Sequence, residues 1–152
     1  MTQKNYQLPE LAYGYDELAP FISEEQLRLH HDKHHLAYVN GANAIFEKLA
    51  KARMEKSDLD MKAVLKELSF HASGHVLHSL FWKNLAPVAQ GGGMPASLLA
   101  EKIQSEFSDF DRFKKEFSQA ALTVEGSGWA ALAQSLEDGR LLIMQTEKHN
   151  IN

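Results

Sequence analysis

The chain has 152 residues, of which 44% are hydrophobic and 24% are charged. This balance is typical of a globular protein and excludes disordered and collagen-like classes. A formal charge of −4 argues against a nucleic-acid partner, because such proteins carry a basic footprint. The sequence contains no cysteine, which excludes disulfides and thiolate sites. It has no apolar run long enough for a membrane span and no secretory signal pattern near residue 1. We therefore expect no membrane partner and a cytoplasmic location.

Two long helices are predicted in the first part of the chain. Ser23 begins a capping-box pattern that predicts an α-helix to about Met54. A short polar break separates it from a second predicted helix, which begins near Asp60 and ends at about Leu85. Two long helices joined by a short loop normally pack as an antiparallel pair. We therefore expect an N-terminal helical hairpin domain over residues 1–90.

Two shorter helices are predicted after a linker. Residues 90–93 are a glycine-rich stretch that is typical of a linker. Pro95 suits the first turn of a third helix. The start signal at residues 108–111 predicts a fourth helix, which reaches about Thr123.

A β-hairpin is predicted to follow these helices. Asp138-Gly139 is a strong hairpin turn signal, and it separates two apolar segments at residues 129–135 and 141–145. The fold class is therefore α+β: the helical hairpin is followed by a C-terminal α/β domain over residues 91–152 with a small antiparallel sheet. Because an isolated two-stranded sheet is marginally stable in water, we expect this domain to be incomplete, with its sheet truncated after two strands.

Histidine is the unusual feature of the composition. Seven of the eight histidines lie between His30 and His78. Residues four or seven apart share one face of an α-helix. On the second predicted helix, that spacing puts three histidines inside the apolar stripe: His71, His75 and His78.

The first predicted helix carries the other four. The same spacing puts His31 and His34 on its apolar stripe, with His30 and His35 on the two flanks. Imidazoles from both helices would then share one dry cleft, which is costly unless they are hydrogen-bonded or bound to a metal. Imidazole is a common ligand of iron, manganese and zinc. The cluster therefore predicts a metal site, and spacing alone favours His31 and His34 over His30 as ligands.

Four segments, in order along the chain, carry a resemblance to a known family. From about Leu8 to its end the chain resembles the iron/manganese superoxide dismutases. The segments are Leu8-Pro9 with Tyr13-Gly14-Tyr15-Asp16, then residues 29–40 (LHHDKHHLAYVN), residues 74–82 (GHVLHSLFW) and residues 126–129 (GSGW).

The resemblance implies a function and a set of site residues. The implied reaction is the metal-dependent disproportionation of superoxide to dioxygen and hydrogen peroxide by one-electron redox cycling. His30 and His78 correspond to two metal ligands of the family, and Tyr38 and His34 to outer-shell groups that relay protons. His149 stands where many members have a glutamine that hydrogen-bonds the metal-bound solvent. The implied cofactor is one iron or manganese ion per subunit, and His149 favours iron.

The resemblance also implies what the 152 residues lack. The family's other two ligands, an aspartate and a histidine, lie beyond Asn152, and no such motif occurs in this sequence. We therefore expect a polypeptide of this length to bind metal weakly and to dismutate little superoxide. A longer chain should be an active homodimer or homotetramer.

Two alternative interpretations stay open. One is an inactive truncated dismutase. The other is a non-catalytic, histidine-rich metal-binding helical protein, which would explain the surplus histidines: His31, His35, His71 and His75.

Overall fold

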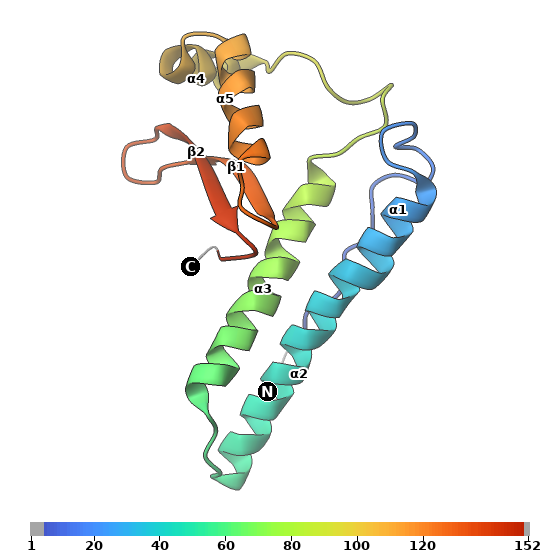
Figure 1. Ribbon diagram of the computed structural model, residues 1–152, viewed down its shortest axis with the longest axis vertical. Helices are drawn as coiled ribbons and strands as arrows, with labels where there is room; N and C mark the ends of the chain where they lie inside the picture. Colours follow the sequence, from blue (N-terminus) through green and yellow to red (C-terminus); the bar gives the residue numbers. More distant parts are fainter. Residues whose placement is uncertain (1–4, 151–152) are drawn as a thin grey trace. The chain divides into compact units, whose positions relative to one another are not determined.

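The computed structural model describes residues 5–150, in two compact units that meet between Gly92 and Gly93. The first unit contains the antiparallel helical hairpin (Figure 1). Three consecutive helical segments form its first arm: α1 (Glu24–Arg28), η1 (Leu29–His35) and α2 (Leu36–Glu55). A single helix, α3 (Met61–Lys83), forms the second arm.

Side-chain caps explain where the two arms begin. The Ser23 hydroxyl accepts a hydrogen bond from the Gln26 backbone N–H at 3.2 Å. The Asp60 carboxylate accepts one from the Ala63 N–H at 3.1 Å. Each bond satisfies a backbone donor that has no partner within its helix. Lys56 ends α2 in the left-handed conformation, at φ 53°. The predicted hairpin is confirmed, with ends close to the predicted ones.

The helix type around the first histidines differs from the prediction. Residues Leu29–His35 form a π-helix, not the continuous α-helix that the sequence predicted. In a π-helix each backbone N–H bonds the carbonyl five residues earlier, so the turn is wider. The α-helical spacing rule therefore fails in this segment. The prediction that His35 lies on a flank is wrong, because His35 is 0% exposed.

Two apolar clusters hold the hairpin together, one at each end of the histidine region. One consists of Ile45, Leu49 and Val64. The other consists of four buried side chains, Tyr13, Leu18, Leu27 and Trp82. The histidines of α3 lie between Val64 and Trp82 along the helix. The clusters thus fix the level at which histidines of the two arms meet.

Two glycines allow the arms to approach closely. A Cβ atom on Gly74 of α3 would lie 2.7 Å from the Tyr38 ring, and one on Gly41 of α2 would lie 2.5 Å from the His71 ring. Carbon atoms do not approach that closely without displacing something. Gly74 and Gly41 are therefore required for the observed packing of Tyr38 and His71.

The second unit contains two helices and a two-stranded sheet. Its elements are α4 (Ser97–Phe107), α5 (Phe110–Leu122), β1 (Gly128–Gln134) and β2 (Leu141–Glu147). The Asp109 carboxylate caps α5 by accepting from the Arg112 N–H at 2.7 Å. Pro95 was predicted inside the first turn of its helix, but it precedes α4, whose N-cap is Ala96.

The sheet is antiparallel, as predicted, but its turn is longer than the predicted two residues. Pairing runs from Gly128 opposite Glu147 to Gln134 opposite Leu141. The loop therefore extends from Ser135 to Arg140, and it is closed by a hydrogen bond from the Ser135 N–H to the Arg140 carbonyl at 2.9 Å. Across residues 5–150, every helix is too short or too polar to cross a membrane.

Candidate metal site

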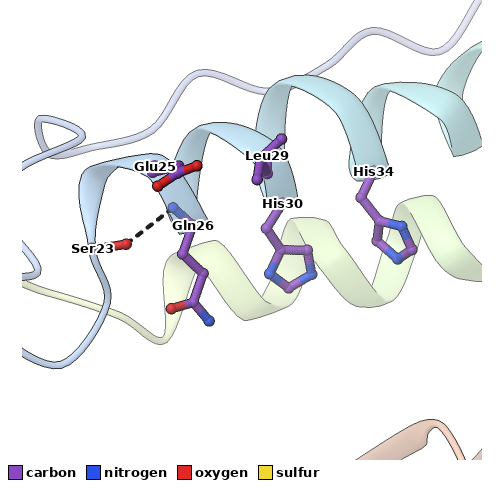
Figure 2. Close-up of a pocket in the computed structure, with 6 residues that line it drawn as sticks. All are labelled: Ser23, Glu25, Gln26, Leu29, His30 and His34. Atoms are coloured by element: carbon purple, nitrogen blue, oxygen red, sulfur yellow. Dashed lines mark hydrogen bonds between the residues drawn. The ribbon is translucent and has the colours of Figure 1, made fainter.

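Three histidines of the first unit converge on one point. His30 and His34 come from η1, and His78 comes from α3. One ring nitrogen from each lies within 4.8 Å of the other two. The Nε2 atoms of His30 and His78 are 3.1 Å apart. Figure 2 shows His30 and His34 projecting from the same side of the helix.

The hydrogen bond of His78 fixes which of its nitrogens can bind a metal. His78 Nδ1 lies 2.7 Å from the Gly74 carbonyl oxygen. A carbonyl can only accept, so Nδ1 carries the proton and Nε2 keeps its lone pair. Metal-ligating histidines characteristically use their second nitrogen in this way. His78 therefore directs its Nε2 lone pair toward His30, whose Nε2 lies 3.1 Å away.

The electrostatics of the site favour neutral imidazoles. Burial lowers the pKa of His30, and the neighbouring His34 and His31 lower it further. A neutral imidazole is the form that binds a metal ion. Imidazole nitrogens suit transition-metal ions, iron and zinc among them. The residues present therefore fit an ion of this class.

Tyr38 extends the site from His34 into the hairpin. Its hydroxyl lies 3.2 Å from His34 Nε2. Tyr38 is 7% exposed, whereas His34 is exposed to solvent. Burial raises the pKa of Tyr38, so its phenol stays protonated at neutral pH. The pair thus links a buried hydroxyl to the solvent.

A surface pocket gives small molecules access to the cluster. Its volume is about 490 Å³, and Figure 2 shows the side chains that line it. They are Ser23, Glu25, Gln26, Leu29, His30 and His34.

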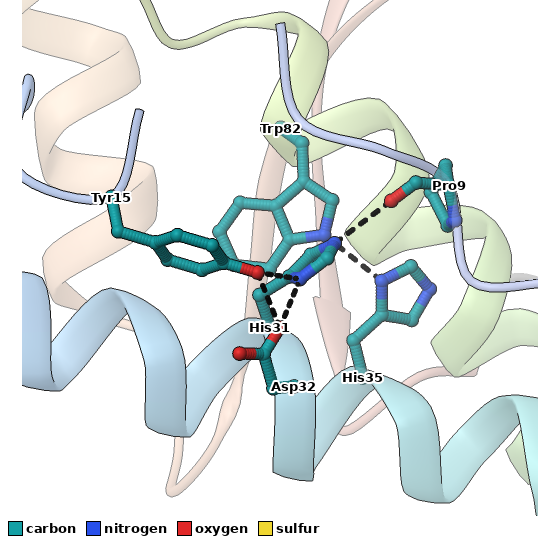
Figure 3. A network of polar contacts seen from close by, with 6 residues as sticks. All are labelled: Pro9, Tyr15, His31, Asp32, His35 and Trp82. Atoms are coloured by element: carbon teal, nitrogen blue, oxygen red, sulfur yellow. Dashed lines mark hydrogen bonds and ion pairs between the residues drawn. The ribbon is translucent and has the colours of Figure 1, made fainter. Parts of the chain in front are cut away.

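His31 does not join the cluster, although α-helical spacing favoured it over His30. Its Nε2 lies 2.8 Å from the Pro9 carbonyl oxygen, and its Nδ1 lies 2.7 Å from Asp32 Oδ1. The Tyr15 hydroxyl donates to the same Asp32 oxygen at 2.5 Å (Figure 3). Both nitrogens of His31 are therefore engaged away from His30. The π-helical turn explains why the spacing rule selected the wrong neighbour.

His35 and His75 form a second histidine pair that the sequence did not reveal. His35 Nε2 lies 2.9 Å from His75 Nδ1, and His35 Nδ1 accepts from Trp82 Nε1 at 2.9 Å. Burial, followed by the neighbouring His78, His75 and His31, lowers the pKa of His35 to about 3. These two surplus histidines are thus satisfied by hydrogen bonds. No sequence signal could assign their partners, because the partners lie on the opposite arm of the hairpin.

His149 belongs to the second unit, where it follows β2. Its Nδ1 accepts a hydrogen bond from Trp129 Nε1 at 3.0 Å. That bond leaves the proton of a neutral His149 ring on Nε2. The role that the resemblance implied for His149 stays a prediction.

Comparison with known proteins assigns the sequence that forms this site to a family. The model of the α-hairpin domain of iron/manganese superoxide dismutases matches residues 5–86, and the model of their C-terminal domain matches residues 95–152. The chain belongs to the iron/manganese superoxide dismutase family. The resemblance read from the four segments is therefore confirmed, as is the α+β fold class.

Individual relatives agree with the family assignment. The chain is 58% identical over 152 residues to the superoxide dismutase (Fe) of Methanothermobacter marburgensis, a match that covers 100% of this chain and 75% of the relative. It is 57% identical to the corresponding protein of Methanothermobacter thermautotrophicus, covering 74% of it. The superoxide dismutase (Mn/Fe) of Aeropyrum pernix is 47% identical over 148 residues, which cover 97% of this chain and 69% of the relative. The chain thus spans about three quarters of the length of the first two relatives.

Proposed function

We propose that this protein dismutates superoxide at an iron or manganese ion held by His30 and His78. In the overall reaction, one superoxide is oxidised to dioxygen, and a second is reduced and takes up two protons to give hydrogen peroxide. The observation that carries the proposal is the convergence of the two Nε2 atoms, 3.1 Å apart on opposite arms of the hairpin. When bound, the metal supplies the one-electron redox chemistry.

The chain's own residues hold the ligands in place. The Gly74 carbonyl accepts from His78 Nδ1 and so fixes the ring with its lone pair on Nε2, the atom that faces His30. For His30 to bind through Nε2, its own proton must lie on Nδ1. Burial disfavours the charged form of His30, which leaves its ring available as a neutral donor.

We assign proton delivery to Tyr38 and His34. The Tyr38 hydroxyl can donate its proton on the buried side and recover one from His34 Nε2, 3.2 Å away. His34 exchanges protons with water because it is exposed. The pocket beside His30 and His34 supports entry of a small anion such as superoxide. His149 is assigned to the solvent-bonding position that the resemblance implied.

A homodimer or homotetramer of the longer chain, and a cytoplasmic location, complete the proposal. Sedimentation equilibrium measures the first of these. A monomer at every concentration tested would contradict the proposed assembly.

Superoxide decay in the presence of the metal-loaded protein tests the function. It should be measured on the 152-residue polypeptide and on a chimera in which the residues that follow the matched region in the Methanothermobacter marburgensis relative are placed after Asn152. We expect the chimera to be active, and His30→Ala or His78→Ala in the chimera to abolish activity. His71→Ala, which removes a half-buried histidine outside the cluster, is the matched control. Full activity of the His30→Ala chimera, or an inactive unsubstituted chimera, would contradict the proposal.

A further inference from the structure

His35 is the buried central member of three hydrogen-bonded side chains, Trp82, His35 and His75, that the proposed reaction does not use. Trp82 Nε1 donates to His35 Nδ1 at 2.9 Å, and His35 Nε2 lies 2.9 Å from His75 Nδ1. His35 is 0% exposed and Trp82 is 4% exposed. The bond between His35 and Trp82 is drawn in Figure 3.

The chemistry of these groups fixes the position of each proton. An indole N–H can only donate, so His35 Nδ1 must be bare. His35 therefore carries its proton on Nε2 and donates it to His75 Nδ1. A protonated Nδ1 would place two N–H groups against each other at Trp82. The geometry thus accommodates the neutral His35 tautomer with its proton on Nε2.

The His35 and Trp82 rings each contact one histidine of the candidate metal site. The His35 ring stacks on His78 with centroids 5.3 Å apart and an interplanar angle of 23°. The Trp82 indole meets the His30 ring edge-on, at 5.0 Å and 76°. Side chains in buried, close-packed positions transmit their orientation to their neighbours.

The N-terminal segment covers His75, the residue to which His35 donates. The Tyr6 ring lies over His75 with centroids 4.7 Å apart. Asn43 of α2 holds the Tyr6 backbone through two hydrogen bonds, accepting from its N–H at 2.8 Å and donating to its carbonyl at 2.9 Å. His75 is thereby covered and kept in position to accept from His35.

We propose that His35 is a positioning residue for both ligands. By accepting the Trp82 N–H it fixes the indole against His30, and by stacking it fixes the plane of His78. His75, covered by Tyr6, maintains the tautomer that this requires. The inference rests on the proposed function only in its assignment of His30 and His78 as ligands.

NMR of the imidazole and indole nitrogens in the metal-free 152-residue chain tests the hydrogen bonds among Trp82, His35 and His75 directly. We expect His35 to be protonated at Nε2 and bare at Nδ1, and the Trp82 indole proton to exchange slowly with water. A proton on His35 Nδ1 would overturn the proposal. Because these signals are read without metal, they decide the role of His35 whether or not the dismutation assay succeeds.

Substitutions then test the effect on the site, with Co²⁺ alone as a spectroscopic probe of metal binding. His35→Leu should speed Trp82 indole exchange at least about tenfold and weaken Co²⁺ binding by about 10–100-fold, the usual effect of removing a group that orients a ligand. His35→Gln should restore most of both, because its amide oxygen can accept from Trp82 while its amide nitrogen donates to His75. His71→Leu is the control for loss of a half-buried imidazole from the hairpin.

Two results would contradict a positioning role. The first is unchanged Co²⁺ binding in a folded His35→Leu protein. The second is an equal loss of Co²⁺ affinity in His35→Leu and His35→Gln, since packing and not hydrogen bonding would then account for the effect. If His35→Leu does not fold, His75→Leu takes its place. It removes the acceptor of the His35 proton, and we expect faster Trp82 indole exchange and weaker Co²⁺ binding. Unchanged Trp82 exchange and Co²⁺ binding in that variant would overturn the proposal.

Discussion

At the scale of single residues, the partner of each histidine determines which of its nitrogens is available. His78 bonds Gly74, and His31 bonds Pro9 and Asp32. The sequence could predict that histidines cluster, because their spacing on α3 is helical and regular. It could not predict that His30 would face His78 while His31 turned away, since that depends on hydrogen bonds to residues distant in the chain.

Tyr15 offers a pH-dependent test of the contacts that hold His31. Burial, with the hydrogen bond to Asp32 and its charge, raises the pKa of Tyr15 from 10.0 to about 12, although Arg28 opposes this. His31, Asp32 and Arg28 are the titratable groups in contact with the phenol. A raised folded-state pKa stabilises the fold fully below about pH 10, and this contribution is lost as the pH rises through about 12.

We therefore expect Tyr15→Phe to lower the free energy of unfolding by about 1 kcal/mol at neutral pH, because a hydrogen bond to a carboxylate is lost. The difference from the unsubstituted protein should shrink between about pH 10 and 12. Urea unfolding of both proteins across this range measures it. A difference in unfolding free energy that stays constant from pH 10 to 12 would contradict the raised pKa of Tyr15.

At the scale of elements, helix ends were predictable and helix type was not. Ser23, Asp60 and Asp109 are polar caps whose effect is local, so the sequence pattern located the starts of the helices that they precede. The π-helix Leu29–His35 has no comparable local signal. Its wider turn is compatible with the contacts that His30 and His35 make with α3, and such segments are frequent at functional sites.

The close packing of α2 against α3 predicts that replacing Gly74 with alanine lowers folding stability, although this substitution within a helix normally raises it. Glycine-to-alanine substitution within a helix ordinarily stabilises it by about 1 kcal/mol. In Gly74→Ala the new methyl group would lie 2.7 Å from the buried Tyr38 ring, and overpacking of this kind costs about 1–3 kcal/mol. We expect net destabilisation in thermal unfolding, together with a shifted Tyr38 environment.

Gly41→Ala is the matched comparison for this substitution. Its methyl group would meet His71, which is half-buried and therefore less tightly enclosed than the buried Tyr38 ring. The loss should therefore be smaller than in Gly74→Ala. A Gly74→Ala protein that is more stable than the unsubstituted chain would show that the arms can separate without cost.

At the scale of the whole molecule, family membership and fold class followed from the sequence because four separate motifs occur in the right order. The matched family domains cover both units of the fold. The six-residue loop after β1 escaped prediction, because Asp138-Gly139 alone satisfies the two-residue turn pattern. Pairing of Gln134 with Leu141 determines the actual length of the loop.

The donor set of the described residues leads to a prediction about metal affinity. In residues 5–150, the cluster of three potential ligands is His30, His34 and His78, without a carboxylate. We expect the 152-residue polypeptide to bind Mn²⁺ at least about 100-fold more weakly than the chimera, since changes to outer-shell groups alone cost 10–100-fold. Competition titration against a chelator measures both affinities. Equal affinities would show that the described residues suffice.

Metal binding by His30→Ala and His31→Ala tests the central assignment most directly. The two histidines are adjacent in sequence, so the pair controls for local changes in η1. Mn²⁺ binding to each metal-free protein, followed by electron paramagnetic resonance, should be lost in His30→Ala. In His31→Ala it should persist, with about 1–3 kcal/mol less folding stability from the lost hydrogen bonds. Binding that persists in His30→Ala and disappears in His31→Ala would contradict the assignment.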